Sequence, residues 1–209
     1  GHDHVRLFDV GDDEFKAIEN MLLAGVVGCK VTPSVARIQR VHNDPLWKAY
    51  TDSWQLLLLL GSPPNERLLW HGTSGLPPSE VYRGQDVGFD MRFAGMNESI
   101  LKAPAYGNGL YFAEKAGYSF RKYAHQTTDV SGYKQLVLAR VLTGHSKDYG
   151  DKKDPTLKRP PERCPGKLYD SVCGGPHKNF RAPDWAASRM YVVFNNAQTY
   201  PAYVVSYTM

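Results

Sequence analysis

Length, composition and charge define the broad class of this chain. It has 209 residues, of which 42% are hydrophobic and 22% are charged, and its formal net charge is +4. These values are typical of a globular protein with one domain, and they exclude disorder over most of the chain. The longest apolar run, Leu56 to Leu60, is too short to span a membrane.

Two helices and a strand are predicted in the first part of the chain. Residues 12–23 begin with three acidic side chains and then repeat apolar residues at helical spacing. Residues 35–41 form a short, partly apolar segment that predicts a strand. Asn43 can cap a second helix with Pro45 near its first turn, and Gly61 can end that helix.

After Pro64 the pattern changes to strands and long loops. One helix is predicted at residues 114–124. The predicted strands are β-branched and aromatic runs at residues 67–70, 136–142, 191–194 and 203–207. Loops of the length predicted at 72–108 and 144–167 are usually functional or disordered. The whole pattern indicates an α+β protein.

Cysteine usage and local charge give two further indications. Cys29, Cys164 and Cys173 leave at least one thiol unpaired, and their spacing matches no zinc pattern. The sequence therefore favours a reduced, intracellular protein without a bound metal. Residues 147–167 hold seven basic and four acidic side chains, which is +3 of the total +4. A solvated loop is the simpler interpretation of this segment, and steering of an acceptor or contact with nucleic acid is the alternative.

The first segment that can carry chemistry is His71-Gly72-Thr73, at the end of an apolar strand. A histidine there would be held on a rigid element at the edge of a cavity. Gly72 has no Cβ, so a flat ligand could approach its backbone closely. Taken alone, a histidine that caps the end of a strand is the simpler interpretation.

The second segment runs from Tyr106 to Ala113, where a Gly-Asn-Gly turn leads into a strand and then a helix. Ser119 and Tyr123 are four residues apart, so they share one face of that helix. They could offer a hydroxyl and a stacking ring to one ligand. Tyr111 and Tyr123 could equally be core aromatics. The turn lacks the third glycine of a dinucleotide-binding fingerprint.

A third segment, residues 189–203, predicts two strands around a polar loop. Taken in order, the segments resemble the catalytic domain of the poly(ADP-ribose) polymerase family, the diphtheria-toxin-like ADP-ribosyltransferases. The resemblance covers about residues 65–207 and is carried by residues 65–73, 106–113, 168–172 and 198–203. Residues 37–50 are similar to the lead-in of the mono-ADP-ribosylating members.

The resemblance implies an ADP-ribosyltransferase fold, in which two antiparallel sheets form an NAD cleft with flanking helices. It also implies a core at 65–209, preceded by a lead-in at 1–64 that belongs to the catalytic unit. NAD+ is the implied co-substrate. The implied NAD+ contacts are His71, Gly72, Thr73, Tyr106, Tyr111, Ser119 and Tyr123. Residues 88–105 would form a lid over the donor site, with Met91, Phe93 and Met96 covering the dinucleotide.

The resemblance also implies specific roles for five of these residues. His71 would hydrogen-bond a ribose hydroxyl, and the Gly72 backbone would bind the nicotinamide carboxamide together with Ser119. Tyr111 would line the nicotinamide site, and Tyr123 would stack on the ring. The offset of four between Ser119 and Tyr123 departs from the family's three or five.

The third position of the catalytic triad departs most from the polymer-forming members. His71 and Tyr111 match the first two residues, but Met190 falls where those members have a glutamate. A thioether cannot accept a proton at neutral pH. No neighbouring acid is an obvious replacement for the glutamate, and Asp184 is close enough in sequence to be checked as one. The resemblance therefore implies transfer of a single ADP-ribose from NAD+ to a protein side chain, with release of nicotinamide. The alternatives are a silent module that binds NAD+ or ADP-ribose, and a transferase acting on nucleic-acid ends.

Overall fold

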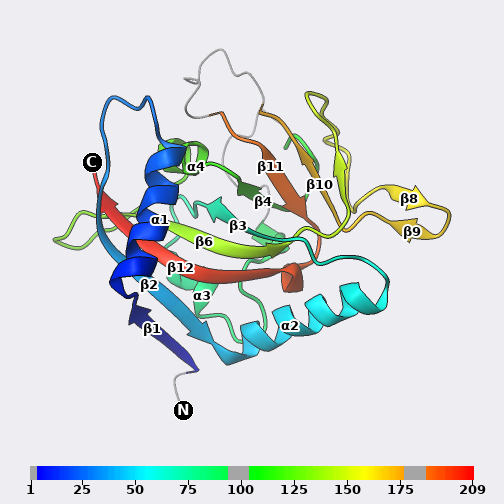
Figure 1. The fold of residues 1–209 in the computed structure, drawn as a ribbon, viewed down its shortest axis with the longest axis horizontal. Coiled ribbons are helices and arrows are strands. Elements are labelled where there is room, and N and C mark those ends of the chain that lie inside the picture. The colour runs from blue at the N-terminus through cyan, green and yellow to red at the C-terminus, as the bar shows by residue number, and fades with distance from the viewer. Residues whose placement is uncertain (1–3, 94–103, 177–186) are drawn as a thin grey trace.

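The computed structural model describes residues 4–93, 104–176 and 187–209, and its architecture is α+β, as predicted (Figure 1). The helices are α1 (Asp12–Gly25), α2 (Asp44–Leu59), α3 (Ser79–Tyr82) and α4 (Ala116–Lys122), with short 3-10 turns at Met91–Phe93 and Asn196–Gln198. The strands are β1 (Val5–Asp9), β2 (Ser34–Asn43), β3 (Glu66–His71), β4 (Leu110–Ala113), β5 (His125–Gln126), β6 (Lys134–Leu142), β7 (Ser146–Asp148), β8 (Glu162–Cys164), β9 (Lys167–Leu168), β10 (Ser171–Gly174), β11 (Met190–Val193) and β12 (Thr199–Thr208).

Ten strands form one mixed sheet, in the order β1-β2-β12-β6-β3-β4-β11-β10-β7, with β5 paired to β6 outside this path. All of its neighbours are antiparallel except β7 and β10. The strands β8 and β9 form a separate two-stranded sheet. The two halves of the large sheet meet between β3 and β4, where Trp70 opposite Ala113 is the one residue pair in register. The two sheets expected from the resemblance are therefore two halves of one sheet, joined at a narrow place.

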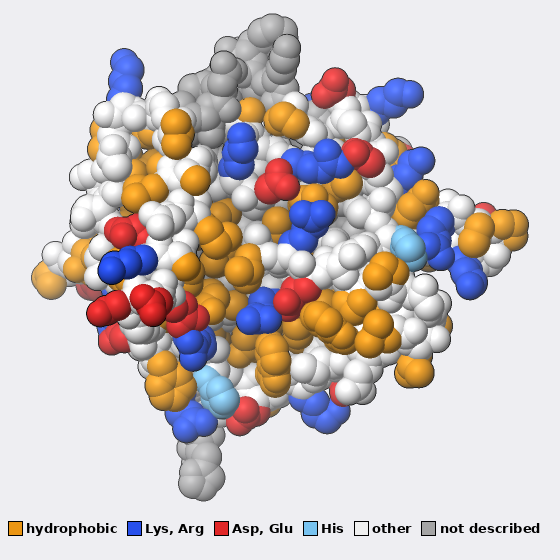
Figure 2. All heavy atoms as spheres, in the orientation of Figure 1, with side chains coloured by type: hydrophobic (Ala, Val, Ile, Leu, Met, Phe, Trp, Pro, Cys, Tyr) orange, Lys and Arg blue, Asp and Glu red, His pale blue; other side chains and the backbone are white. Residues whose placement is uncertain are grey.

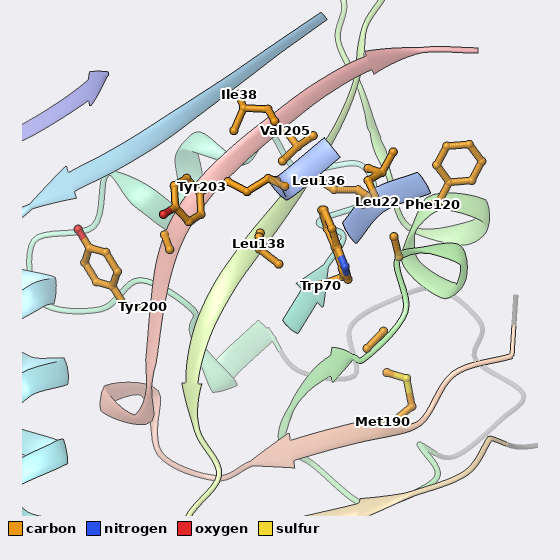
Figure 3. Packing of buried hydrophobic residues seen from close by; sticks show 14 of the residues in the cluster. Leu22, Ile38, Trp70, Phe120, Leu136, Leu138, Met190, Tyr200, Tyr203 and Val205 are labelled. Atoms are coloured by element: carbon orange, nitrogen blue, oxygen red, sulfur yellow. The ribbon is translucent and has the colours of Figure 1, made fainter. Parts of the chain in front are cut away.

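The first two helices pack on one face of this sheet. Their apolar residues, including Ile18, Leu22 and Tyr50, join a buried cluster that contains Trp70 and Leu138 (Figure 3). A second cluster on other positions of the same strands contains Leu69, Phe112 and Val137. Successive side chains of a strand point to opposite faces, so neighbours such as Leu69 and Trp70 belong to different clusters.

The signals that predicted α2 act as expected. Asn43 precedes the helix, and its side-chain oxygen accepts a hydrogen bond from the Leu46 amide at 3.1 Å. Gly61 follows the helix with φ of +72°, a left-handed conformation that suits glycine. The helix expected at 114–124 is shorter in the structure, where it begins at Ala116 and ends at Lys122.

The lead-in contributes strands as well as helices. β2 is the predicted strand, and it pairs with β12 on one side, while β1 adds an unpredicted edge strand on its other side. The loop predicted at 144–167 contains β7 and the β8–β9 hairpin. None of the described helices is long and apolar enough to cross a membrane.

Candidate active site

His71 is the last residue of β3, at the place where the two halves of the sheet separate. The backbone pairing between β3 and β4 ends with Trp70 and Ala113. One residue later, the His71 side chain makes the connection instead, because its Nδ1 lies 2.9 Å from the carbonyl oxygen of Tyr111 on β4. The histidine therefore bridges the two halves of the sheet with its side chain.

This contact decides which ring nitrogen of His71 carries a proton. A carbonyl oxygen can only accept a hydrogen bond, so Nδ1 must be the donor. In the neutral ring Nε2 then has a free lone pair and can accept a hydrogen bond from a hydroxyl. Burial lowers the pKa of His71 below its ordinary value, and the bond to Tyr111 offsets this only in part. His71 is therefore neutral at pH 7.

Two aromatic rings hold the imidazole of His71 in place. Its ring centroid lies 5.0 Å from that of Phe89 and 5.3 Å from that of Phe112. Phe89 and Phe112 also contact each other edge to face, at 5.0 Å. Phe89 lies in the first part of the segment predicted to be a lid, and sequence reasoning did not single it out as a partner of the histidine.

The hydroxyl of Tyr111 is committed to the turn that precedes β4. It donates to the carbonyl of Gly107 and accepts from the amide of Tyr106, both at 2.8 Å. Burial raises the pKa of Tyr111, so the hydroxyl stays protonated. Tyr106 is fully buried, and its ring lies 5.8 Å from that of Tyr149. Tyr106 and Tyr111, which are both predicted site residues, therefore shape the turn that precedes β4.

Gly72 lies directly against the backbone at the end of α4. A Cβ on Gly72 would stand 2.3 Å from the carbonyl oxygen of Tyr123. The same oxygen accepts a hydrogen bond from the Ser74 amide at 2.7 Å. The hydroxyl of Thr73 donates to the carbonyl of Leu76 at 2.6 Å and closes the following turn. The structure thus requires glycine at position 72 for packing, independently of any ligand.

Through Ser119 and Tyr123, α4 and its C-terminal end contact Trp70 of β3 and Gly72. Ser119 is buried, and its Oγ lies 3.5 Å from the carbonyl oxygen of Trp70, at the long limit for a hydrogen bond. Tyr123 caps the helix through a bond from its amide to the Ser119 carbonyl. Its ring lies 5.4 Å from that of Tyr118 at 32°. Sequence reasoning did not identify Tyr118 as the neighbour of the Tyr123 ring.

Met190 occupies the first position of β11. It pairs with Ala113 of β4 on one side and with Gly174 of β10 on the other. Its side chain is 7% exposed and belongs to the cluster that contains Trp70 (Figure 3). His71, Tyr111 and Met190 therefore come from three adjacent strands, β3, β4 and β11.

Part of the predicted site lies outside the described residues. Met96 and Asp184 belong to the segments that are not described, and nothing of the Phe93 side chain is described either. Met91 packs against the cluster that contains Phe89. Among residues 4–93, 104–176 and 187–209, no three His, Cys, Asp or Glu side chains are grouped in a way that could hold a metal ion.

Comparison with known proteins agrees with this geometry. The family model described as the poly(ADP-ribose) polymerase catalytic domain matches residues 12–209. The chain is 31% identical to the human protein mono-ADP-ribosyltransferase PARP14 over 83% of its length, which is 9% of that protein. It is 32% identical to the mouse protein mono-ADP-ribosyltransferase PARP11, over 83% of this chain and 52% of the relative.

A relative from Dictyostelium discoideum, a probable poly [ADP-ribose] polymerase, is 30% identical over 83% of this chain and 44% of its own length. The chain thus spans between 9% and 52% of the length of these three relatives. The match to the family model covers nearly the whole chain and includes every strand that carries a residue of the site. This chain belongs to the family of poly(ADP-ribose) polymerase catalytic domains.

Proposed function

We propose that this chain transfers single ADP-ribose units from NAD+ to a side chain of an acceptor protein and releases nicotinamide. The observation that carries the proposal is the combination of a neutral, oriented His71 with a buried thioether at Met190. The names of two of the relatives, human PARP14 and mouse PARP11, include mono-ADP-ribosyltransferase, which supports single transfer.

The arrangement fits a nicotinamide nucleotide. The Nε2 atom of His71 is available to accept a hydrogen bond from a ribose hydroxyl. Ser119 makes only a long bond to Trp70, so its hydroxyl can turn to a carboxamide, for which the Gly72 backbone also offers polar groups. The ring of Tyr123 lies at the end of the same helix and can stack on the pyridine ring.

The transfer needs no general acid. When the bond between the ribose C1′ and the nicotinamide nitrogen breaks, its electron pair goes to the pyridinium nitrogen, and nicotinamide leaves as a neutral molecule. The ribose passes through an oxocarbenium-like state, as in glycoside hydrolysis. The residues named above would hold the nicotinamide and its ribose in a fixed orientation, which is the main contribution the protein can make.

Met190 limits which nucleophile can complete the reaction. An acceptor carboxylate already carries the electron pair that forms the new bond to C1′, so no proton has to be removed. A ribose hydroxyl, the nucleophile of chain growth, would need a base, and the thioether of Met190 cannot serve as one. Burial raises the pKa of Tyr191, and the charge of Glu114 contributes a smaller effect in the same direction. By the alternation of β11, Tyr191 points to the opposite face from Met190.

The same proposal includes the division of the chain. Residues 1–64 would form a lead-in that belongs to the catalytic unit, followed by the transferase core at 65–209. The pairing of β2 with β12 supports this, because the lead-in then completes the central sheet. An intracellular location also remains a proposal. It is supported by the three free cysteines, of which Cys164 is exposed.

Intact-mass analysis after incubation with NAD+ tests the function. The wild type should gain mass in steps of one ADP-ribose per modified site, and His71→Ala should lose this gain. His42→Ala is a matched control, because His42 lies on β2 with a 42% exposed side chain. A ladder of long polymer would contradict single transfer. NAD+ binding without mass gain would favour the silent module, and preferential labelling of a phosphorylated oligonucleotide would favour the nucleic-acid alternative.

A further inference from the structure

We propose that residues 150–168, the basic arm, form the docking surface for an acidic segment of the acceptor protein. The inference rests on the proposed transferase function, since it concerns the choice of acceptor. The arm contains the β8–β9 hairpin and projects from the sheet on the right of Figure 1. It holds six basic and three acidic residues, a local excess of +3.

The basic side chains of the arm are available for a partner. None of them forms an ion pair with another residue in the described part of the chain. Five of the six are exposed: Lys152, Lys153, Lys158, Arg159 and Lys167. Figure 2 shows Lys and Arg side chains gathered on this projection with little acidic surface between them.

The acidic side chains of the arm mostly turn back onto its own backbone. Asp154 accepts hydrogen bonds from the amide and the hydroxyl of Thr156, at 3.1 and 2.6 Å. Glu162 accepts from the amide of Gly166 at 2.7 Å. These carboxylates shape the loops of the arm and do not neutralise its lysines directly. The surface offered to a partner is therefore positive.

Residues of the arm also line an open cavity, called the hollow below, of about 630 Å³. Its lining combines Lys158 and Arg159 with the apolar side chains of Leu157, Pro160, Pro161 and Leu168. Glu162 also lines it, and its carboxylate is bonded to the Gly166 amide. Leu168 is 41% exposed. A surface that places two basic side chains beside apolar ones fits a polypeptide that carries carboxylates beside an apolar side chain.

The composition of the arm argues against nucleic acid as its partner. Residues 150–168 contain no aromatic side chain. The two tyrosines that border them are already engaged, because Tyr149 lies against Tyr106 and the Tyr169 ring lies against Lys147. Proteins that bind single-stranded nucleic acid place aromatic rings between their cations, so that bases can stack on them. A phosphate backbone would also leave the apolar part of the hollow unused. The chemistry of the arm therefore favours an acidic polypeptide.

The arm is fixed to the turn that leads into the candidate site. The carbonyl of Leu157 accepts the Asn108 amide at 3.0 Å, and the Asp154 amide donates to Ala105 at 2.9 Å. Gly107 in this turn has φ of +72°, and a Cβ there would stand 1.8 Å from the Leu157 oxygen. The carbonyl of the same Gly107 accepts the hydroxyl of Tyr111. A partner held by the arm is thus held against the element that carries Tyr111.

Fluorescence anisotropy with a short labelled peptide of alternating glutamate and leucine tests the docking surface. Reversing two charges of the hollow, with Lys158→Glu and Arg159→Glu together, should weaken peptide binding about tenfold or more. The control pair Lys16→Glu and Lys30→Glu reverses the same number of exposed charges away from the arm, and it should change binding less than about twofold. Equal binding by the wild type and the arm variant would overturn the proposal. Tighter, arm-dependent binding of a single-stranded DNA oligonucleotide would also overturn it.

Nicotinamide release without any acceptor separates this inference from the proposed function. The arm variant should release nicotinamide at the wild-type rate, which also shows that it is folded, and should transfer less ADP-ribose to a glutamate-rich protein. If its transfer to that protein stays at the wild-type rate, the docking surface is refuted while the transferase stands. If the wild type releases no nicotinamide even when the glutamate-rich protein is present as acceptor, the proposed function fails, and the peptide measurement still decides whether the arm binds acidic segments.

Discussion

The junction between β6 and β12 and the junction between β3 and β4 belong to one sheet, but different interactions hold them together. The β6–β12 junction has eight residue pairs with one register shift between Pro201 and Tyr203, and every residue of β12 except Thr208 is buried. At the β3–β4 junction one backbone pair is in register. There the bond from His71 to the Tyr111 carbonyl extends the contact between the strands, and the long bond from Ser119 to Trp70 ties α4 to β3.

This difference separates stability from function within one sheet. Where backbone pairing is extensive, it holds the strands together with the burial of apolar side chains. Where the pairing stops, side chains replace it, and some of their polar atoms remain free, such as Nε2 of His71. Changes at the first junction should therefore act mainly on unfolding, and changes at the second mainly on the reaction.

Truncation at the β6–β12 junction should have the largest effect on stability. Leu138 on β6 is fully buried and lies in the cluster with Trp70. Leu138→Ala should lower the free energy of unfolding by about 3 kcal/mol, because it removes buried methyl groups and leaves a cavity. Urea denaturation measures this, with Leu59→Ala as the control, since Leu59 is 84% exposed. If Leu138→Ala and Leu59→Ala lowered the free energy of unfolding equally, the difference drawn here between the two junctions of the sheet would be contradicted.

Gly72→Ala should affect both stability and reaction. The new Cβ would stand 2.3 Å from the Tyr123 oxygen and push it away from the Ser74 amide. We expect a loss of about 1–3 kcal/mol in the free energy of unfolding from the overpacking. Because the ring of Tyr123 moves too, nicotinamide release should fall at least about tenfold. Gly75→Ala is the matched control, since a Cβ at position 75 meets nothing within 4 Å. A Gly72→Ala variant as active as this control would contradict the close contact between Gly72 and the Tyr123 backbone.

Tyr111→Phe tests the hydroxyl that holds the turn before β4. The change leaves the Tyr106 amide and the Gly107 carbonyl without their partner. The free energy of unfolding should fall by about 1–2 kcal/mol, the usual cost of such unpaired groups. Thermal or urea unfolding can be compared with Tyr169→Phe, whose hydroxyl has no hydrogen bond within the described residues. An unchanged stability would show that the turn does not depend on Tyr111.

The smallest expected effect is a pH dependence from His71. Its pKa is lowered in the folded protein, so the unfolded chain binds more protons between the folded pKa and the ordinary value of 6.5. The contribution of neutral His71 to stability is therefore complete above pH 6.5, falls as the pH drops from 6.5 to the folded pKa, and changes no further below that pKa. Urea unfolding of the wild type and His71→Asn over this range measures the difference. If the free energy of unfolding changes with pH equally in both proteins, His71 is not the source of the pH dependence.

Local signals made much of the fold predictable. Asn43 and Gly61 mark the ends of α2, and the β-branched runs mark β6, β11 and β12. Long-range pairing was not predictable in the same way. Nothing in residues 5–9 or 146–148 shows which strand they join, because such short edge strands depend on their partner's register.

The candidate site was predicted as residue types, whereas its contacts came from the structure. The sequence shows His71, but it does not show that Nδ1 reaches the Tyr111 carbonyl, because that bond exists only where two strands separate. Gly72 was expected for the approach of a ligand, whereas its neighbour in the structure is the Tyr123 backbone. Tyr106 was expected near NAD+ and lies fully buried. Such details depend on packing between distant segments.

The protonation of the His71 ring tests the central claim most directly. Long-range ¹H–¹⁵N correlation of the histidine rings at pH 7, assigned with the His71→Asn variant, reports which nitrogen carries the proton. We predict a neutral ring with the proton on Nδ1 and a bare Nε2, as the bond to the Tyr111 carbonyl requires. A proton on Nε2 at this pH, in either the other neutral tautomer or an imidazolium ring, would contradict the assignment of this nitrogen as the acceptor for a ribose hydroxyl.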